Sequence, residues 1–355
     1  MIVFSIFKQI LLILLFPWYI FATDNTSCDA IKKYIIFDES GEFEKIQEKS
    51  LLIISKLLEK SGRFEDCIRY FEEKNKNGFV CDKILDLNPN DSHDKFEKIV
   101  TEMRNRNLTV CNCIKYLTTQ AIKEVVDKEF PSLSEAEKKA VYQIPNYTGN
   151  IGKVHCDANI PSEFCDTVRA MYVGKNDLFV REDNSLSNKN IAYASENNII
   201  GLDTQRSKTL TRSELFHTAR HETVHLNCAH VMKGQYLVNT LNNEVSDRSI
   251  LELIKAQEGQ ADMIPAACNS LQAARDCEQR LYKLYKDRLY NYQSQEQIKK
   301  GFFLSRSFKH IDYDKFSAYE EAFDSEHPAS RVSLYWAIVV RKLREIEEIQ
   351  QQQTK

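Results

Sequence analysis

A cluster of histidines near the middle of this 355-residue chain has the spacing that metal chemistry requires. His221, Glu222 and His225 form the pattern H-E-x-x-H. Residues four apart lie on one face of a helix, so His221 and His225 can bind the same ion. Catalytic zinc accepts histidine nitrogens and keeps an open position for water, whose proton the glutamate can take. The pattern predicts a catalytic zinc site with one Zn²⁺ per chain and Glu222 as general base.

Two nearby histidines, His217 and His230, are not expected to bind the zinc ion. His217 is followed by Thr218, so no general base stands beside it, and we expect it to be a packed or supporting histidine. The metzincin pattern requires Gly three residues and His six residues after the second zinc histidine. Cys228 and Val231 occupy those positions. That class is therefore excluded, and His230 is expected at the surface or at a helix end.

A third zinc ligand is expected further along the chain. The stretch from Glu258 to Asp262 reads E-x-x-A-D, which places two carboxylates four residues apart on one helical face. A carboxylate from a second helix can complete a site of two histidines and one glutamate. The aspartate can accept the other ring N–H of a zinc histidine. We predict Glu258 as the ligand and Asp262 as the residue that holds a ligating histidine.

The order of these motifs resembles that of zinc endopeptidases of the HtpX and CAAX-prenyl-endopeptidase type. A histidine–proline segment and an arginine before the last helix come third in that order, and His327 and Arg331 supply them here, at a shorter interval than is usual in the family. The resemblance covers about residues 140–345. It implies a small gluzincin domain with a short sheet, protein or peptide substrates, and a catalytic role for His327 near the zinc as an oxyanion stabiliser. Tyr319 and Tyr335 are alternative candidates for that role.

The N-terminal residues predict export. After Lys8 an apolar run reaches Ala22, a length typical of the hydrophobic part of a signal peptide and short for a membrane span. Residues 1–22 are therefore predicted to be a signal peptide and the mature protein to be secreted or periplasmic. A retained N-terminal anchor is the alternative, and we expect membrane contact through that segment alone.

The cysteine content agrees with export. The chain has ten cysteines, and an even number in an exported protein suggests disulfides. Cys228 follows His225 by three residues, and Cys268 follows Glu258 by ten. Because both ligands bind one ion, the two helices must pass close together. We predict a disulfide between Cys228 and Cys268. The alternatives are Cys277 as the partner, with Cys268 buried, or no bridge at all.

The elements that must position these residues are mostly helices. Helical patterns cover about residues 43–76, 93–104, 111–129 and 132–143. Strand-like alternation follows at 168–173 and 177–183, and residues 191–203 read as a β-hairpin. Thr211 with Glu214 predicts a capping box at the start of the zinc helix.

Length and composition suggest two folded parts and a mainly α (α+β) fold. We divide the chain into the signal peptide, a helical N-terminal region at 23–140, a zinc metallopeptidase domain at 141–345 and a polar tail at 346–355. The net charge of −3 excludes a strongly basic nucleic-acid binder. The sequence therefore predicts an exported zinc endopeptidase acting on proteins or peptides. The alternative is an exported helical binding or chaperone-like protein with a structural or weakly active zinc site. No oligomeric state is indicated.

Overall fold

The computed structural model describes residues 80–353 except 187–190, 242–244 and 300–312. The expected signal peptide and the predicted helical hairpin at 43–76 lie outside the described residues. Contacts divide the chain after Val80, and Cys81–Lys355 form one compact unit. The segment 81–140, assigned from sequence to the N-terminal helical region, therefore belongs to the same unit as the histidine cluster.

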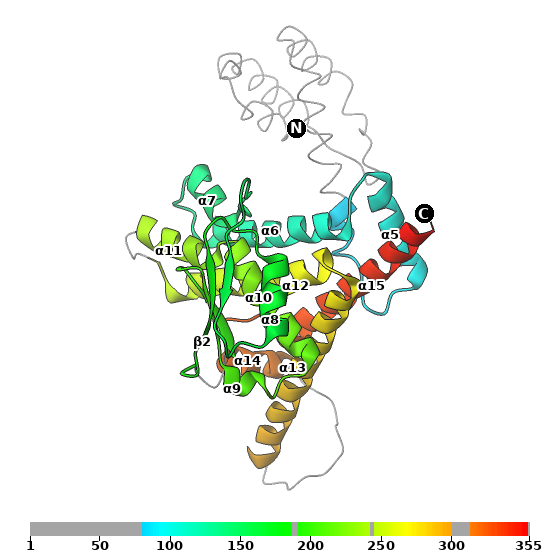
Figure 1. The fold of residues 1–355 in the computed structure, drawn as a ribbon. Coiled ribbons are helices and arrows are strands. Elements are labelled where there is room, and N and C mark those ends of the chain that lie inside the picture. The colour runs from blue at the N-terminus through cyan, green and yellow to red at the C-terminus, as the bar shows by residue number, and fades with distance from the viewer. Residues whose placement is uncertain (1–79, 187–190, 242–244, 300–312, 354–355) are drawn as a thin grey trace, which may run out of the picture. The chain divides into compact units, whose positions relative to one another are not determined.

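The described part is mainly helical, with one small sheet (Figure 1). The helices are α5 (His93–Asn105), α6 (Val110–Glu129), α7 (Glu135–Tyr142), α8 (Ser162–Met171), α9 (Thr204–Ser207), α10 (Arg212–Asn227), α11 (His230–Thr240), α12 (Asp247–Cys268), α13 (Leu271–Lys299), α14 (Tyr313–Phe323) and α15 (Ser330–Gln352). The strands are β1 (Val154–Cys156), β2 (Leu178–Glu182), β3 (Ala192–Ser195) and β4 (Ile199–Leu202).

Local sequence explains where several helices begin. The helices predicted near residues 93 and 111 are confirmed as α5 and α6, and the third pattern forms α7. Ser134 caps α7 and Glu137 returns a bond to its backbone, so a capping box satisfies amide groups that lack helical partners. Thr109 and Asn112 do the same for α6. These caps set where helices α6 and α7 begin.

The sheet has the strand order β1-β2-β4-β3, in which β3 and β4 are antiparallel and the other pairs are parallel. The predicted hairpin is confirmed by the β3–β4 pair, and β2 confirms the strand at 177–183. The strand predicted at 168–173 is wrong, because residues 168–171 form about the last turn of α8. Its buried residues Phe164, Cys165 and Val168 follow helical spacing and pack against the strands.

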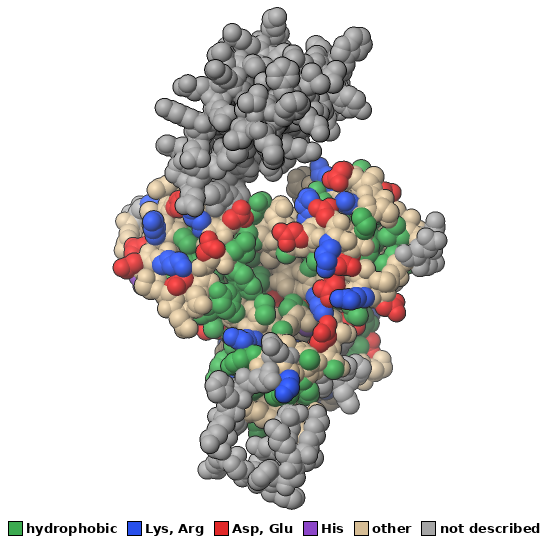
Figure 2. Space-filling model, turned by 180° about the vertical axis from the view of Figure 1, so that it is seen from behind, with side chains coloured by type: hydrophobic (Ala, Val, Ile, Leu, Met, Phe, Trp, Pro, Cys, Tyr) green, Lys and Arg blue, Asp and Glu red, His purple; other side chains and the backbone are tan. Residues whose placement is uncertain are grey.

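The histidine-bearing helix α10 lies between the sheet and the other helices. Ala219 of α10 joins the apolar cluster formed by α8 and the inner face of the sheet. On its other side, α12 packs against α10, α6, α13 and α15. Figure 2 shows acidic and basic side chains intermixed over the described part of one face, with hydrophobic side chains gathered between them.

The C-terminal residues continue a helix that was expected to be a polar tail. Helix α15 runs to Gln352, and Glu347 and Gln350 are buried. The Glu347 carboxylate accepts the backbone N–H of Val110 at 2.9 Å, at the start of α6. The residues expected to form a separate polar tail from 346 are therefore part of α15 up to Gln352, and the buried Glu347 bonds to a neighbouring helix instead of to water.

Among the described residues, three disulfides are formed, joining Cys81 to Cys113, Cys111 to Cys268 and Cys156 to Cys165. The predicted Cys228–Cys268 bond is wrong. Cys228 is a buried free thiol at the end of α10, in an apolar cluster with Ala261 and Ile264 of α12. The two helices do pass close together, but the end of α12 reaches the start of α6, where Cys111 is the partner.

Candidate metal centre

Helix α10 presents three histidines on one face. The predicted capping box is confirmed, because Thr211 accepts the backbone N–H of Glu214 and the Glu214 carboxylate accepts that of Thr211. His217, His221 and His225 follow at intervals of four residues, one helical turn apart. Across from them runs α12, which carries the two carboxylates of E-x-x-A-D.

The structure brings His221, His225 and Glu258 together. Nε2 of His221 lies 2.9 Å from a carboxylate oxygen of Glu258 and 3.0 Å from Nε2 of His225. Nε2 of His225 lies 3.3 Å from the second Glu258 oxygen. A tetrahedral zinc ion with bonds of about 2.0–2.1 Å would hold its ligand atoms roughly 3.3 Å apart. The three groups could therefore hold one metal ion, and their spacing fits zinc with little adjustment.

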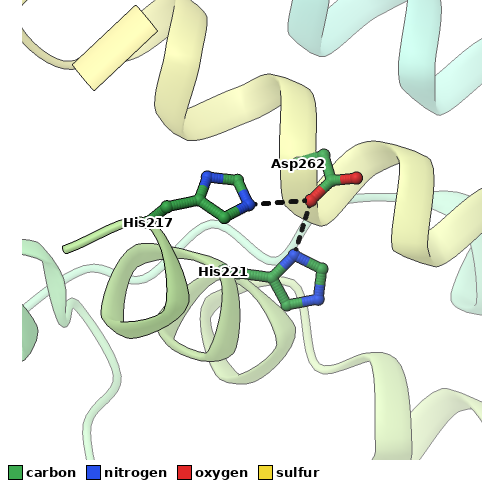
Figure 3. Close-up of side chains that lie close together, drawn as sticks. All are labelled: His217, His221 and Asp262. Atoms are coloured by element: carbon green, nitrogen blue, oxygen red, sulfur yellow. Dashed lines mark hydrogen bonds and ion pairs between the residues drawn. The ribbon is translucent and has the colours of Figure 1, made fainter. Parts of the chain in front are cut away.

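Hydrogen bonds on the far side of His221 leave Nε2 available for an ion. Nδ1 of His221 lies 2.8 Å from Oδ1 of Asp262, and Nε2 of His217 lies 3.3 Å from the same oxygen (Figure 3). An ionised carboxylate only accepts, so Nδ1 of His221 is the donor. In the neutral ring, Nε2 then carries a lone pair that points toward Glu258. Asp262 thus lies where the sequence analysis expects it, with His217 as a packed, supporting histidine.

A chain of buried groups fixes His225 in the same way. Nε2 of His230 lies 2.9 Å from the amide oxygen of Gln260, and Nδ1 of His230 lies 3.0 Å from Nδ1 of His225. The Gln260 amide nitrogen donates to the Thr118 hydroxyl at 3.1 Å. Because the Gln260 oxygen accepts, His230 donates through Nε2 and accepts through Nδ1 from His225. Nε2 of His225 is therefore also left with a lone pair.

His230 differs from its expected place. It is 2 % exposed at the start of α11, so the expectation of a surface position is wrong and that of a helix end is right. Its role depends on Gln260, thirty residues further along the chain. The interval between the two residues gives no pattern that could have revealed this contact.

The carboxylates of Glu258 and Asp262 favour the binding of a cation at the site. Burial disfavours a charged ring, yet hydrogen bonds to Asp262 and Glu258 outweigh it and raise the pKa of His221 well above its ordinary value. For Glu258, burial is likewise outweighed by His225, His221 and His327, and the pKa falls well below the usual range. Two ionised carboxylates thus draw positive charge toward the histidine nitrogens, which a divalent ion would supply.

Glu222 stands beside the candidate ion site but is not one of its ligands. It lines the same cavity as His221, His225 and Glu258 and is 9 % exposed. Burial is the main cause that raises the pKa of Glu222, although the neighbouring histidines oppose it. A carboxylate with a raised pKa is a better proton acceptor near neutral pH, as general-base catalysis requires.

His327 reaches the site from the segment between α14 and α15. Its Nε2 lies 3.3 Å from Glu258, and its Nδ1 lies 3.0 Å from Asp324. Burial disfavours its charge, but the bonds to Asp324 and Glu258 prevail and raise the pKa of His327 to about 10. Pro328 follows directly and approaches Gly259 of α12. His327 is therefore placed to donate a proton or hydrogen bond beside the ligands.

The other expected residues of this segment lie elsewhere. The guanidinium of Arg331 lies 4.0 Å from the centroid of the Tyr313 ring. The Tyr335 hydroxyl donates to the backbone oxygen of Leu87, and Tyr319 packs on Tyr292. None of the three is among the residues that line the cavity around Glu222, so the described structure does not bring them to the site.

A second group of three could also hold an ion. His217, His221 and Asp262 have ligand atoms within 4.8 Å of one another, and both rings contact the same Asp262 oxygen (Figure 3). This group uses Nδ1 of His221, which is opposite the atom that faces His225 and Glu258. The residues of both groups line the same cavity. We take the triad with Glu258 as the candidate centre because it contains both histidines of H-E-x-x-H, with Glu222 beside His221.

The site opens into a cavity of about 760 Å³. Its walls come from β3, α10, α11, α12, α13 and the segment that holds His327. Strand β3 is the last in the sheet order, and the consecutive residues Ile191–Ala194 line the cavity. An extended chain could therefore lie along this edge, above the ligands.

The chain matches no protein-family model, no curated protein and no solved structure. Of the helices in the described ranges, none has both the length and the hydropathy needed to cross a bilayer. The site is thus interpreted from its own geometry.

Proposed function

We propose that this protein is a zinc-dependent endopeptidase that hydrolyses peptide bonds in proteins or peptides. The observation that carries the proposal is the pair of histidines, His221 half-buried and His225 buried, whose Nδ1 atoms are engaged by Asp262 and His230, leaving two Nε2 atoms and Glu258 facing one another. A structural zinc site is usually closed by four protein ligands, whereas three ligands and an open cavity suit catalysis.

When bound, Zn²⁺ polarises the scissile carbonyl and acidifies the attacking water. Glu222 accepts the proton of that water and delivers it to the leaving amine, since it adjoins the ligands without being one of them. His327 donates a hydrogen bond to the oxygen that gains negative charge, held in place by Asp324. The edge of β3 opposite β4, which pairs with no other strand among the described residues, holds the substrate as an added strand.

The family and the cellular location are part of this proposal. Membership of the HtpX and CAAX-prenyl-endopeptidase type rests on the order of H-E-x-x-H, E-x-x-A-D and the His327 segment. Export rests on the signal-like residues 1–22 and agrees with three disulfides, which persist in oxidising compartments.

Exchanging Glu222 for Gln separates the proposed enzyme from a binding protein with a structural zinc. Glutamine cannot accept the proton, so Glu222→Gln should retain zinc while hydrolysis of casein or peptides falls by about 10²–10⁴-fold or more. Zinc content by elemental analysis and cleavage rates are measured together. Arg220, on the same helix, forms an ion pair with Asp276, and Arg220→Lys is the matched control. Unchanged cleavage by Glu222→Gln at equal zinc content contradicts the mechanism, and an inactive wild type favours the binding protein.

A further inference from the structure

The cavity beside the candidate metal centre has an apolar wall on α11 and α12. Five aliphatic side chains of these two helices line it: Val231, Val238, Ile250, Leu253 and Ile254. They fall at helical spacing on each helix, so each helix turns one face toward the cavity. We call this part of the cavity the α11–α12 chamber.

The chamber begins one helical turn from the metal ligand on α12. Ile254 precedes Glu258 by four residues, and Ile250 precedes Ile254 by four. At 1.5 Å per residue, the chamber wall therefore starts about 6 Å along the helix axis from the ligand. That distance is close to the spacing of adjacent side chains in a peptide. A side chain next to the reacting bond would reach the chamber.

Gly234 faces open space in this cavity. It lies inside α11 and lines the cavity, and a Cβ added to it would meet no heavy atom within 4 Å. Glycine inside a helix costs about 0.5–1 kcal/mol relative to alanine. No packing contact explains this glycine, whereas an occupant of the chamber would. Any larger side chain here would project into the chamber.

Gln257 supplies a polar group at the wall of the same cavity. It is 5 % exposed, and its Nε2 has no hydrogen-bond partner in the described part of the structure. Leaving a buried donor unpaired costs roughly 1–3 kcal/mol. The residue lies directly before Glu258 on α12 and lines the cavity, so a carbonyl oxygen of a bound peptide could accept from it.

We propose that the α11–α12 chamber is the specificity pocket, and that it binds a bulky aliphatic or aromatic side chain adjacent to the scissile bond. Gly234 sets its depth, and Gln257 donates to the peptide backbone. This inference rests on the proposed peptidase function. It assigns the substrate class as peptides with large apolar residues at the cleavage site, in contrast to charged or small ones.

The test is cleavage-site profiling. Wild-type protein loaded with zinc is incubated with a pool of synthetic peptides that contains all pairs of adjacent residues, and mass spectrometry maps the cuts. We expect leucine or phenylalanine beside the cut to be favoured over alanine at least about tenfold in kcat/KM. Gly234→Leu should lose that preference and still cut at alanine. Gly234→Ala should lie between them, which guards against a folding defect in the larger variant.

Met232 provides the matched control, since it lies on the same helix, is 58 % exposed and does not line the cavity. Met232→Leu should retain the wild-type profile. Gln257→Met should slow cleavage of favoured and disfavoured peptides alike. A Gly234→Leu profile identical to that of the wild type would overturn the assignment of the pocket.

A binding measurement separates this inference from the function on which it rests. Fluorescence anisotropy with Glu222→Gln compares labelled peptides that differ only in leucine or alanine, with and without Gly234→Leu. Selective binding that Gly234→Leu removes supports the chamber even if no peptide is cleaved. Cleavage without any selectivity retains the peptidase and rejects the chamber. Neither cleavage nor selective binding rejects both.

Discussion

Each histidine of the candidate metal centre depends on a neighbour that positions its ring. Asp262 accepts from His221, and His230 accepts from His225, so both Nε2 atoms point at the same small volume. Such supporting groups fix the tautomer and ring orientation of metal ligands, and their loss typically lowers metal affinity about 10–100-fold.

Removal of the proposed carboxylate ligand should weaken metal binding the most. In Glu258→Ala only two histidines remain, an incomplete set for zinc. We expect zinc to be lost during dialysis against a weak chelator that leaves the wild type loaded. Glu252→Ala is the control, since Glu252 is a half-buried residue of α12 that pairs with Lys255. Equal zinc retention in Glu258→Ala and wild type would remove Glu258 from the site.

The buried His230 should contribute to the affinity without touching the ion. In His230→Leu the Nδ1–H of His225 loses its acceptor, and zinc affinity measured by competition with a chromogenic chelator should fall about 10–100-fold. His155→Leu, in an exposed histidine paired with Asp177, should leave the affinity unchanged. An unaltered affinity in His230→Leu would show that His225 is oriented by packing alone.

The residues that belong to the two motifs could be identified from the sequence. His230 and Gln260, which position His225, could not. His221, Glu222, His225 and Glu258 follow fixed intervals on two helices, and the structure brings all four to one cavity. The contact of His230 with His225 and Gln260 depends on how three helices pack, which no interval along one helix records.

Among the helices and strands, α12 contributes to the metal centre, to the chamber and to a disulfide. It supplies Glu258 and Asp262, forms one wall of the chamber and is covalently joined to α6 through Cys268 and Cys111. Its packing between α6, α10, α13 and α15 explains why the predicted boundary near residue 140 separates helices that the structure joins.

Loss of the Cys111–Cys268 bond should destabilise the protein more than loss of the short Cys156–Cys165 loop. The first encloses a separation of 157 residues and the second one of nine, so the entropy model gives a difference of roughly 2.5 kcal/mol. Urea unfolding of Cys111→Ser/Cys268→Ser and Cys156→Ser/Cys165→Ser checks this. A larger loss for the short loop would mean that local strain, and not chain entropy, governs these bonds.

Elements with strong end signals were the ones predictable from sequence. Thr211 and the hairpin near Glu196–Asn198 mark ends by side-chain or turn chemistry that acts over three or four residues. The helix expected to start at Ser132 begins two residues later, after the cap Ser134. The segment 168–173 carries too short an apolar pattern to distinguish a strand from the end of a helix. The disulfide partners depend on helix register, which only the packed fold fixes.

At the scale of the whole molecule, the buried carboxylate of Glu214 links helices α10 and α13 through ion pairs. Glu214 of α10 is 2 % exposed and pairs with Arg280 at 3.2 Å and Lys283 at 2.8 Å on α13. Burial raises its pKa, but the bonds to Lys283, Thr211 and Arg280 together lower the pKa of Glu214 from 4.5 to about 2. The folded state therefore favours the ionised carboxylate.

Acid should weaken the fold through this group. Since the folded pKa is lower than the unfolded one, the stabilisation is complete above pH 4.5 and disappears as pH falls toward 2. Urea unfolding of metal-free protein should show a steeper loss of stability below pH 4.5 in wild type than in Glu214→Gln. The exposed Glu135→Gln should follow the wild type. Parallel pH profiles for wild type and Glu214→Gln would contradict the assignment.

The bond between Cys111 and Cys268 closes the backbone into a covalent ring. The sheet, α10, α11 and most of α12 lie inside this ring, together with every proposed metal ligand. A single backbone cut within it would open the ring without releasing a fragment. His221 and His225 on one side of such a nick would remain tethered to Glu258 on the other, at a high effective concentration. After one backbone cut by a peptidase, including a cut made by the protein's own proposed activity, the three proposed metal ligands would stay in one covalently joined molecule.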